Sequence, residues 1–427
     1  MKFLKALLLL SVTAFVSLNV KAADSGSSDL VLKKNDLVAI VGDSITEQKI
    51  YSKFIEAYLL ATRPDLELRT IQLGWGGERA PGFVARMEND LMSFNPNVVT
   101  LCYGMNDGSY GPYNDNIGKI YETNMRKIVE RLKKANAAVI VGTPGVVDTK
   151  TWRKPDLANV YNQNLGKLGE IDAKIAKDYS ERFADLHTTM LDVMKKAKAA
   201  YGEGYHVAGT DGVHPSTNGH LVMAYAFLKA MGFDGNIGNI TVAWNGKAEA
   251  SEGHKLVSFK DGKAVVESSR YPFCFQGPQD KSPYNARGIL PFLPFNQDLN
   301  RFTLVVTGLS EAKAEVKWGK NKKVFTKEQL EMGINLADEF QDGNPFCANF
   351  NKLMSEIGKK QSFETGFIKK LLNPKPFACA ELKDDKEAND AINSLDKKLR
   401  EKEVAYQKTV AATVVPVKHE IEIKPIK

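Results

Sequence analysis

IVGDSITE, at residues 40–47, decides the fold of this 427-residue chain. The octapeptide closes a short apolar run and turns at Gly42, where the missing side chain permits a tight backbone. Ser44 follows at the expected start of a helix, where free N–H groups favour developing negative charge. An aspartate or serine before a helix is also an ordinary N-cap, so a purely structural interpretation stays open for these residues alone.

A second polar motif, DGVH at residues 211–214, stands about 170 residues later and supplies a histidine and an aspartate that could act on this serine. A serine hydroxyl becomes a nucleophile when a histidine takes its proton and a third group orients that histidine. Asp211 can hold the His214 imidazole in one tautomer, so that the other ring nitrogen faces Ser44. The structural alternative is a helix N-terminal turn with a solvated histidine.

Two motifs between them could donate hydrogen bonds to a negatively charged oxygen. Gly77 lies in GWGGE, residues 74–78, and Asn106 lies in GMND, residues 104–107. Each could equally be a turn, because glycine, asparagine and aspartate dominate turns. A phosphate-binding loop is disfavoured, since no Gly-Lys-Ser/Thr follows the glycines.

Residues 36–231 alternate between strand and helix patterns, which predicts an α/β fold with a parallel sheet covered on both faces. In such folds ligands bind beyond the carboxyl ends of the strands, and the four motifs above each follow a predicted strand at that edge. The predicted strands are 37–41, 66–73, 97–103, 137–142 and 183–186, and the predicted helices are 49–61, 81–94, 116–134, 157–177, 188–200 and 217–231.

The pattern changes after Gly232, where short strands separated by turns suggest a β sandwich. A stretch rich in proline and aromatic residues, 271–297, is expected to be an ordered loop. Residues 327–408 are predicted as a helical insertion, with the highly charged part, 382–408, as an exposed hairpin. The predicted strands of this half are 240–244, 255–259, 264–267, 302–306, 314–318, 322–325 and a final strand at 414–423.

The chain begins like a secretory signal peptide. Lys2 and Lys5 precede the apolar run 7–16, and small residues stand near Ala22, where a signal peptidase would cut. An uncleaved anchor is the alternative, although the run is short for a membrane span. We therefore expect a signal peptide at 1–22, a domain that holds the motifs above at 23–232 and a C-terminal domain at 233–427, in a secreted or periplasmic protein without a membrane span.

Charge and cysteines exclude some classes of function. The formal charge of +7 falls to +4 without the three leader lysines, and acids are interleaved with bases, so no nucleic-acid partner is expected. Cys102 is expected to be a free core thiol, and Cys347 and Cys379 could pair. His206 and His214 could share a metal, but no ligand spacing supports one, so no metal is expected.

Taken together, these motifs resemble the GDSL/SGNH hydrolase superfamily. Gly42-Asp43-Ser44-Ile45 resembles its first block, Gly77 its glycine block, 104–107 its Gly–x–Asn–Asp block and 211–214 its Asp–x–x–His block, in the same order. The resemblance covers about residues 36–231. It implies a flavodoxin-like three-layer α/β/α fold and ester hydrolysis without a cofactor.

The resemblance also assigns roles. It implies that Ser44 is the nucleophile, His214 the base and Asp211 its partner, with an oxyanion hole formed by the Ser44 and Gly77 N–H groups and the Asn106 side chain. One departure is that Gln72 stands where many members carry asparagine before the glycine block. That difference puts the anchoring of the loop or the shape of the pocket in question.

The substrate is less determined. Asp43, Trp75 and Tyr110 are candidates to contact it, although the aromatic residues could simply pack under loops. Export and an appended β domain favour an acetyl ester on a carbohydrate, as a small molecule or a polysaccharide. A lipid or other acyl ester is the alternative, and a non-catalytic glycan-binding protein on a hydrolase fold is a third hypothesis.

Overall fold

The computed structural model describes residues 30–278 and 280–427. The expected signal peptide, 1–22, lies outside these described residues. Within them, no helix combines the length and apolar character needed to cross a membrane.

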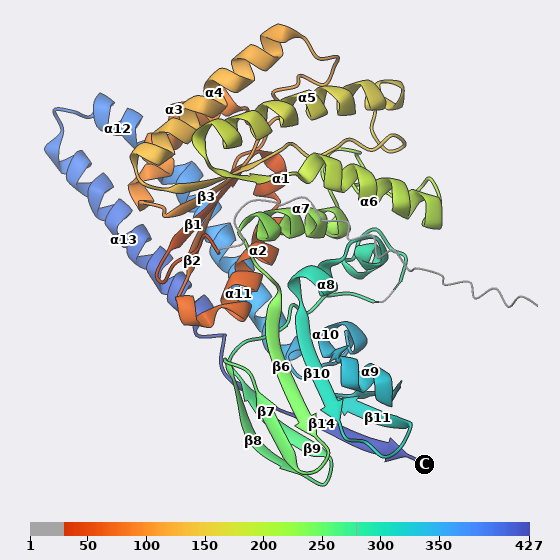
Figure 1. Ribbon diagram of the computed structural model, residues 1–427. Coiled ribbons are helices and arrows are strands. Elements are labelled where there is room, and N and C mark those ends of the chain that lie inside the picture. Colours follow the sequence, from red (N-terminus) through yellow and green to blue (C-terminus); the bar gives the residue numbers. More distant parts are fainter. Residues whose placement is uncertain (1–29, 279) are drawn as a thin grey trace, which may run out of the picture.

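The first half is built on a five-stranded parallel sheet in the order β2-β1-β3-β4-β5. Figure 1 shows β2, β1 and β3 side by side. All six residues of the inner strand β1 (Leu37–Gly42) are buried, and alternate side chains enter two different cores. Val38 and Ile40 join the core that contains residues of α2 and α7, whereas Ala39 and Val41 join the core that contains residues of α3 and α4. Both faces of the sheet are therefore covered, and the predicted α/β/α class is confirmed.

The predicted elements of this half recur with small shifts. The second strand begins later than expected because Pro64 starts a short 3-10 turn. The remaining strands are β2 (Arg69–Gly74), β3 (Val98–Cys102), β4 (Ala138–Gly142) and β5 (Arg182–Ala184), and the helices are α1 (Ser44–Glu47), α2 (Tyr51–Thr62), α3 (Ala80–Asp90), α4 (Asp115–Lys134), α5 (Pro155–Tyr179), α6 (Leu186–Tyr201) and α7 (Thr217–Ala230), with 3-10 turns η1 (Pro64–Leu66) and η2 (Met92–Phe94).

The second half holds two further sheets, in the orders β13-β10-β6-β7 and β12-β11-β14-β9-β8. Their side chains meet where Phe302 of β10 stacks on Trp318 of β11, with ring centroids 5.6 Å apart. The expected β-rich region is confirmed, with one parallel pair, β6 and β10, among antiparallel ones. The strands are β6 (Asn236–Ala243), β7 (Lys247–Ala250), β8 (His254–Lys260), β9 (Lys263–Ser268), β10 (Arg301–Thr307), β11 (Lys313–Trp318), β12 (Asn321–Thr326), β13 (Ile334–Asn335) and β14 (Val417–Ile426).

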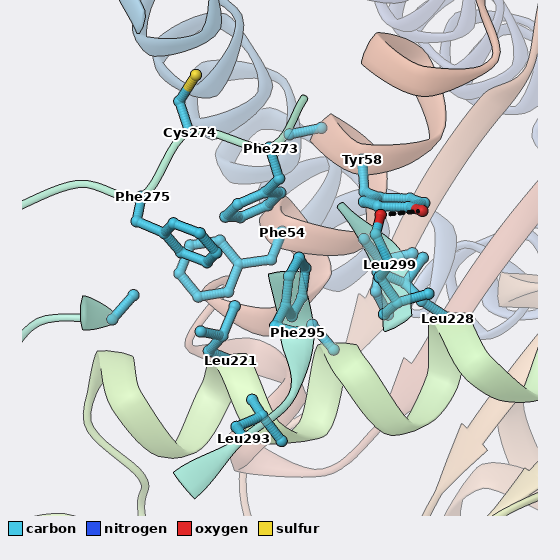
Figure 2. Packing of buried hydrophobic residues seen from close by; sticks show 14 of the residues in the cluster. Phe54, Tyr58, Leu221, Leu228, Phe273, Cys274, Phe275, Leu293, Phe295 and Leu299 are labelled. Atoms are coloured by element: carbon cyan, nitrogen blue, oxygen red, sulfur yellow. Dashed lines mark hydrogen bonds between the residues drawn. The ribbon is translucent and has the colours of Figure 1, made fainter. Parts of the chain in front are cut away.

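The aromatic stretch after β9 joins the two halves. Phe273 and Phe275 turn inward beside Phe54 of α2, and Figure 2 shows them packed with Phe295 above α7. The Tyr58 hydroxyl of α2 donates to the carbonyl oxygen of Leu299 at 2.7 Å. The described residues of the stretch include η3 (Arg287–Phe292) and the start of α8 (Phe295–Leu299), so the expected loop is partly helical.

In the segment between β12 and β14, helices α11 to α13 fold back along the first sheet, whereas α9 and α10 lie beside β10 (Figure 1). Residues 382–408 were expected to form an exposed hairpin, and that prediction is wrong. A single helix spans 386–411 and packs against α11, which itself contacts α2 and β2. The segment comprises α9 (Lys327–Met332), α10 (Leu336–Glu339), α11 (Cys347–Phe367), the π-helical turn η4 (Ile368–Leu372), α12 (Lys375–Glu381) and α13 (Lys386–Ala411).

Helix α11 covers the open edge of the sheet at β2. Lys360 donates to the carbonyl oxygen of Thr70 at 2.7 Å, and the Gln72 N–H donates to Glu364 at 3.1 Å. The Lys360 ammonium is fully buried between the carboxylates of Glu56, at 3.0 Å, and Glu364, at 2.8 Å. Side chains therefore satisfy peptide groups that a sheet edge would otherwise leave unpaired.

The cysteines do not pair as the sequence allowed. Cys102, Cys274, Cys347 and Cys379 are all free thiols, so the Cys347–Cys379 bridge is not formed. The thiol of Cys274 instead donates to the side-chain oxygen of Asn344 at 3.6 Å, and that of Cys347 approaches the carbonyl oxygen of Gln341 at 4.0 Å. Cys102 is a buried free thiol, as expected.

Replacing Lys360 by methionine should lower the free energy of unfolding by about 3–5 kcal/mol, because two buried carboxylates lose their cation. The adjacent Lys359 is the matched control. Its exposed pair with Glu356 has 61% of the lysine side chain in solvent, so Lys359→Met should change stability by less than about 1 kcal/mol. Urea unfolding of both variants measures the difference, and equal effects would contradict the assigned role of the buried cation.

Candidate active site

Three side chains from both ends of the first half form a continuous hydrogen-bonded chain. The hydroxyl oxygen of Ser44 lies 2.8 Å from Nε2 of His214. Nδ1 of the same ring lies 2.7 Å from a carboxylate oxygen of Asp211. Ser44 opens α1 directly after β1, and the other two residues lie in the loop before α7. The structure thus brings together residues that are 170 positions apart.

The loop that carries the histidine is shaped by its own backbone. One Asp211 oxygen accepts the N–H groups of Val213 and His214, each at 2.9 Å, while the other faces the ring. Gly212 has φ of +74°, and a β-carbon there would lie 2.3 Å from the backbone nitrogen of Trp152. Glycine is therefore required at this position by both conformation and space.

Asp211 is arranged to be ionised. Burial pushes its pKa upward, but hydrogen bonds from the His214 N–H, the His214 ring and the Val213 N–H outweigh burial and lower the pKa below its ordinary value. An ionised carboxylate beside Nδ1 keeps the proton on that nitrogen. The Nε2 atom then presents a lone pair to Ser44.

Two backbone N–H groups near the serine have no acceptor among the described residues. One belongs to Ser44, the first residue of α1, and the other to Gly77 in the loop after β2. Gly77 is exposed and has φ of +70°, a conformation that favours glycine. Unpaired N–H groups on rigid backbone are suited to receive a developing oxyanion.

The Asn106 side chain contacts three neighbours in the site. Its amide donates to the Glu78 carbonyl oxygen at 3.0 Å and approaches the Asp43 carboxylate at 3.4 Å. Its own oxygen accepts the Tyr110 hydroxyl at 2.8 Å. The side chain is thus held on three sides, and its N–H groups contact protein acceptors in this structure.

The three residues expected to contact substrate lie in different settings. Asp43 is 2% exposed, and its carboxylate caps α1 by accepting the Ile45 N–H. Its contact with substrate stays a prediction. Trp75 and Tyr110 are both half-buried. The Tyr110 ring stacks on Tyr161, with 5.3 Å between ring centroids, so one side of it is packed. The rest of the side chain is partly exposed.

Two supporting residues were not assigned roles from the sequence. Gln72 donates to the carbonyl oxygen of Thr46, two residues after the serine, at 2.6 Å. Glu47 accepts the Gly76 N–H at 2.5 Å. The only sequence signal was that glutamine replaces the family asparagine at position 72. Nothing in the local pattern distinguished Glu47 from an ordinary surface acid.

In the described part of the chain, no group of three histidine, cysteine or carboxylate side chains is placed to hold a metal ion. His206 packs edge-on against Tyr284. His214 bonds Ser44 and Asp211.

Comparison with known proteins decides the family. A family model described as GDSL-like lipase/acylhydrolase matches residues 40–222. Residues 40–222 belong to this family. An acetylxylan esterase of Geobacillus stearothermophilus is 25% identical over 191 residues, which are 43% of this chain and 81% of that protein. An isoamyl acetate-hydrolyzing esterase of Saccharomyces cerevisiae is 24% identical over 209 residues, 45% of this chain and 84% of that protein.

A solved structure shares the fold of both halves. The structure of "a gut microbial diltiazem-metabolizing enzyme" matches with a TM-score of 0.72 and 21% identity, covering 94% of this chain and 100% of its own. The β-rich half and the helical segment are therefore part of a fold found elsewhere with the hydrolase half. From the family match and the two related esterases, we conclude that this protein is a serine ester hydrolase.

The raised pKa of Asp43 should make the stability of the protein depend on pH. Burial, together with the charges of Asp107 and Glu78, raises its pKa to about 7, although the Ile45 N–H opposes this. Its carboxyl group therefore stays protonated in the folded protein after it has ionised in the unfolded chain. Stability falls as pH rises from about 4 to about 7, by up to roughly 4 kcal/mol for this one group.

Asp43→Asn removes that titration. Between pH 4 and pH 8, the free energy of unfolding measured with urea should therefore fall less in the variant than in the unmodified protein. Asp192→Asn, at an exposed ion pair on α6, is the control and should keep the original slope. Identical slopes in all three proteins would refute the internal position of this carboxyl group.

Proposed function

We propose that the protein is an exported serine esterase that removes acetyl groups from carbohydrate through a covalent acyl-enzyme. The observation that carries the proposal is the chain of short contacts from Ser44 through His214 to Asp211, at 2.8 and 2.7 Å. This arrangement supports a serine that is deprotonated as it attacks.

In the first step the Ser44 oxygen attacks the ester carbonyl carbon while Nε2 of His214 takes the hydroxyl proton. Asp211 stabilises the imidazolium that forms. The carbonyl oxygen becomes an oxyanion, which the N–H groups of Ser44 and Gly77 stabilise. The amide of Asn106 joins them by exchanging its long 3.4 Å contact with Asp43 for the oxyanion. Collapse of this intermediate breaks the bond to the alcohol, which leaves with the proton from His214.

In the second step a water molecule loses a proton to His214 and attacks the acyl-enzyme. A second oxyanion forms in the same place and collapses to release the acid, and the Ser44 oxygen recovers its proton from the ring. The same three side chains thus serve both halves of the reaction, and they require no further reactant besides water.

The choice of substrate rests on the relatives and on the site. The two curated relatives are named for acetyl esters of different alcohols, a xylan and isoamyl alcohol. A lipid chain needs an apolar groove, whereas His214, Asn106 and Gly77 beside the serine offer polar groups or no side chain. The half-buried Trp75, in the same loop as Gly77, offers an aromatic edge to a sugar ring. Export through cleavage near Ala22 would bring the enzyme to polysaccharide outside the cytoplasm.

Ser44→Ala should reduce hydrolysis of a chromogenic acetyl ester by about 10⁴-fold or more, because it removes the nucleophile. Ser109→Ala, a control at an exposed serine whose hydroxyl donates to a backbone carbonyl, should retain turnover. A fluorophosphonate should label the peptide that contains Ser44 and no other serine. Full turnover in the Ser44 variant, or labelling elsewhere, would overturn the mechanism.

The acetyl ester of a chromogenic alcohol should be hydrolysed with kcat/KM at least about tenfold above that for the octanoyl ester of the same alcohol, because no broad apolar groove is needed for a methyl group. Acetylated xylo-oligosaccharide should also release acetate. The measurement compares chain lengths from acetyl to octanoyl on one chromogenic alcohol, then free acetate from the oligosaccharide. A preference that rises with chain length would instead assign the enzyme to lipid or long-chain esters.

A further inference from the structure

The helical segment of the C-terminal half reaches the active-site support at Lys369. This residue lies in the π-helical turn η4, which continues α11. Ile368 and Leu372, on the same turn, are buried in the core beneath the first sheet, so the backbone of the turn is anchored. Single π-helical turns are often found where a helix is adapted to place a side chain.

Both oxygens of the Glu47 carboxylate are engaged, one by each half of the chain. Glu47 ends α1, three residues after Ser44. One oxygen accepts the Lys369 ammonium, and the other accepts the Gly76 N–H at 2.5 Å. Glu47 therefore connects the C-terminal half to the residue that directly precedes Gly77.

The same lysine also contacts the aromatic ring of that loop. The Lys369 nitrogen lies 4.6 Å from the Trp75 ring centroid, and the Arg86 guanidinium lies 4.9 Å from it. Arg86 is itself fixed by two bonds to Glu78, at 2.6 and 2.7 Å. Cation–π contacts of this kind hold the ring, and with it the backbone of residues 75–78.

A second contact from the same helix supports the other side of the loop. The Thr365 hydroxyl donates to the Gln72 side-chain oxygen at 3.2 Å, and the Gln72 amide donates to the carbonyl oxygen of Thr46. A β-carbon at Gly74 would lie 2.2 Å from the Glu47 nitrogen, so the loop and α1 are in direct contact. The C-terminal helix thus supports the serine turn and the glycine loop at two separate points.

We propose that Lys369 is a positioning residue of the active site, which holds Glu47 and Trp75 so that the Gly77 N–H stays directed at the oxyanion formed on Ser44. The inference rests on the proposed function, in which Gly77 is an oxyanion donor. An exposed ion pair would contribute little. Here the lysine and glutamate side chains are only 27% and 28% exposed, and the carboxylate is also bonded to loop backbone.

The physical consequence is a loss of rate with little loss of binding. An oxyanion donor acts in the transition state, so a displaced Gly77 N–H lowers kcat and leaves ground-state affinity nearly unchanged. Displacements of about 1 Å in such groups can lower rates by about 100-fold. The C-terminal half would then contribute to catalysis itself, in addition to any recognition of polymer.

The test compares Lys369→Met with Lys370→Met, its exposed neighbour on the same turn, on a small chromogenic acetyl ester. The Lys369 variant should lose about 10- to 100-fold in kcat while KM changes less than about twofold, and fluorophosphonate labelling should slow in parallel. Lys370→Met should match the unmodified enzyme, and Lys369→Arg should recover most of the rate. Thermal unfolding midpoints verify that each variant is folded.

A double variant isolates the route of the effect. If Lys369 acts through Glu47, Lys369→Met combined with Glu47→Gln should be no slower than the slower single variant, because the two changes break one connection. Multiplicative losses, an unchanged kcat in Lys369→Met, or a rise in KM alone would overturn the proposal. Turnover that persists in Ser44→Ala would overturn the proposed function instead, whereas an inactive Ser44 variant beside a fully active Lys369 variant would sink only this inference.

Discussion

The edge strand β2 sets the constraint on which the rest of the structure depends. An open parallel sheet leaves the peptide groups of its outer strand unpaired, and these groups lose free energy if they are buried without partners. In this chain, Lys360 and Glu364 from α11 satisfy the groups of Thr70 and Gln72, about 290 residues away in sequence. The ammonium of Lys360 tolerates burial because two carboxylates and a carbonyl oxygen surround it.

This arrangement makes the two halves of the chain interdependent. The C-terminal helices cover the strand that ends in the glycine loop, and the aromatic segment before β10 packs against α2 and α7. One continuous core includes residues of both halves. A solved structure shares both halves of the fold. This agrees with the shared core, because neither half would be complete without the other.

The sequence predicted the hydrolase half well because its signals are local. Apolar runs that end in glycine or a polar turn determine parallel strands, and IVGDSITE and DGVH each place a functional group directly after such a feature. The prediction failed where partners are distant. The charged segment 382–408 has the composition of an exposed hairpin, but one face of the helix is sheltered by α11.

The sequence by itself determined the class of fold, the order of its elements and the identity of the serine, histidine and aspartate to test, because each follows from spacing over a few residues. Only the tertiary structure decided that Gln72 supports the serine turn, that Glu47 joins the glycine loop to Lys369, and that a lysine from the far end of the chain is buried at the sheet edge. Such contacts depend on how separate elements are brought together in space. A one-dimensional pattern of polar and apolar residues records which side chains are charged, but it does not record which charges meet.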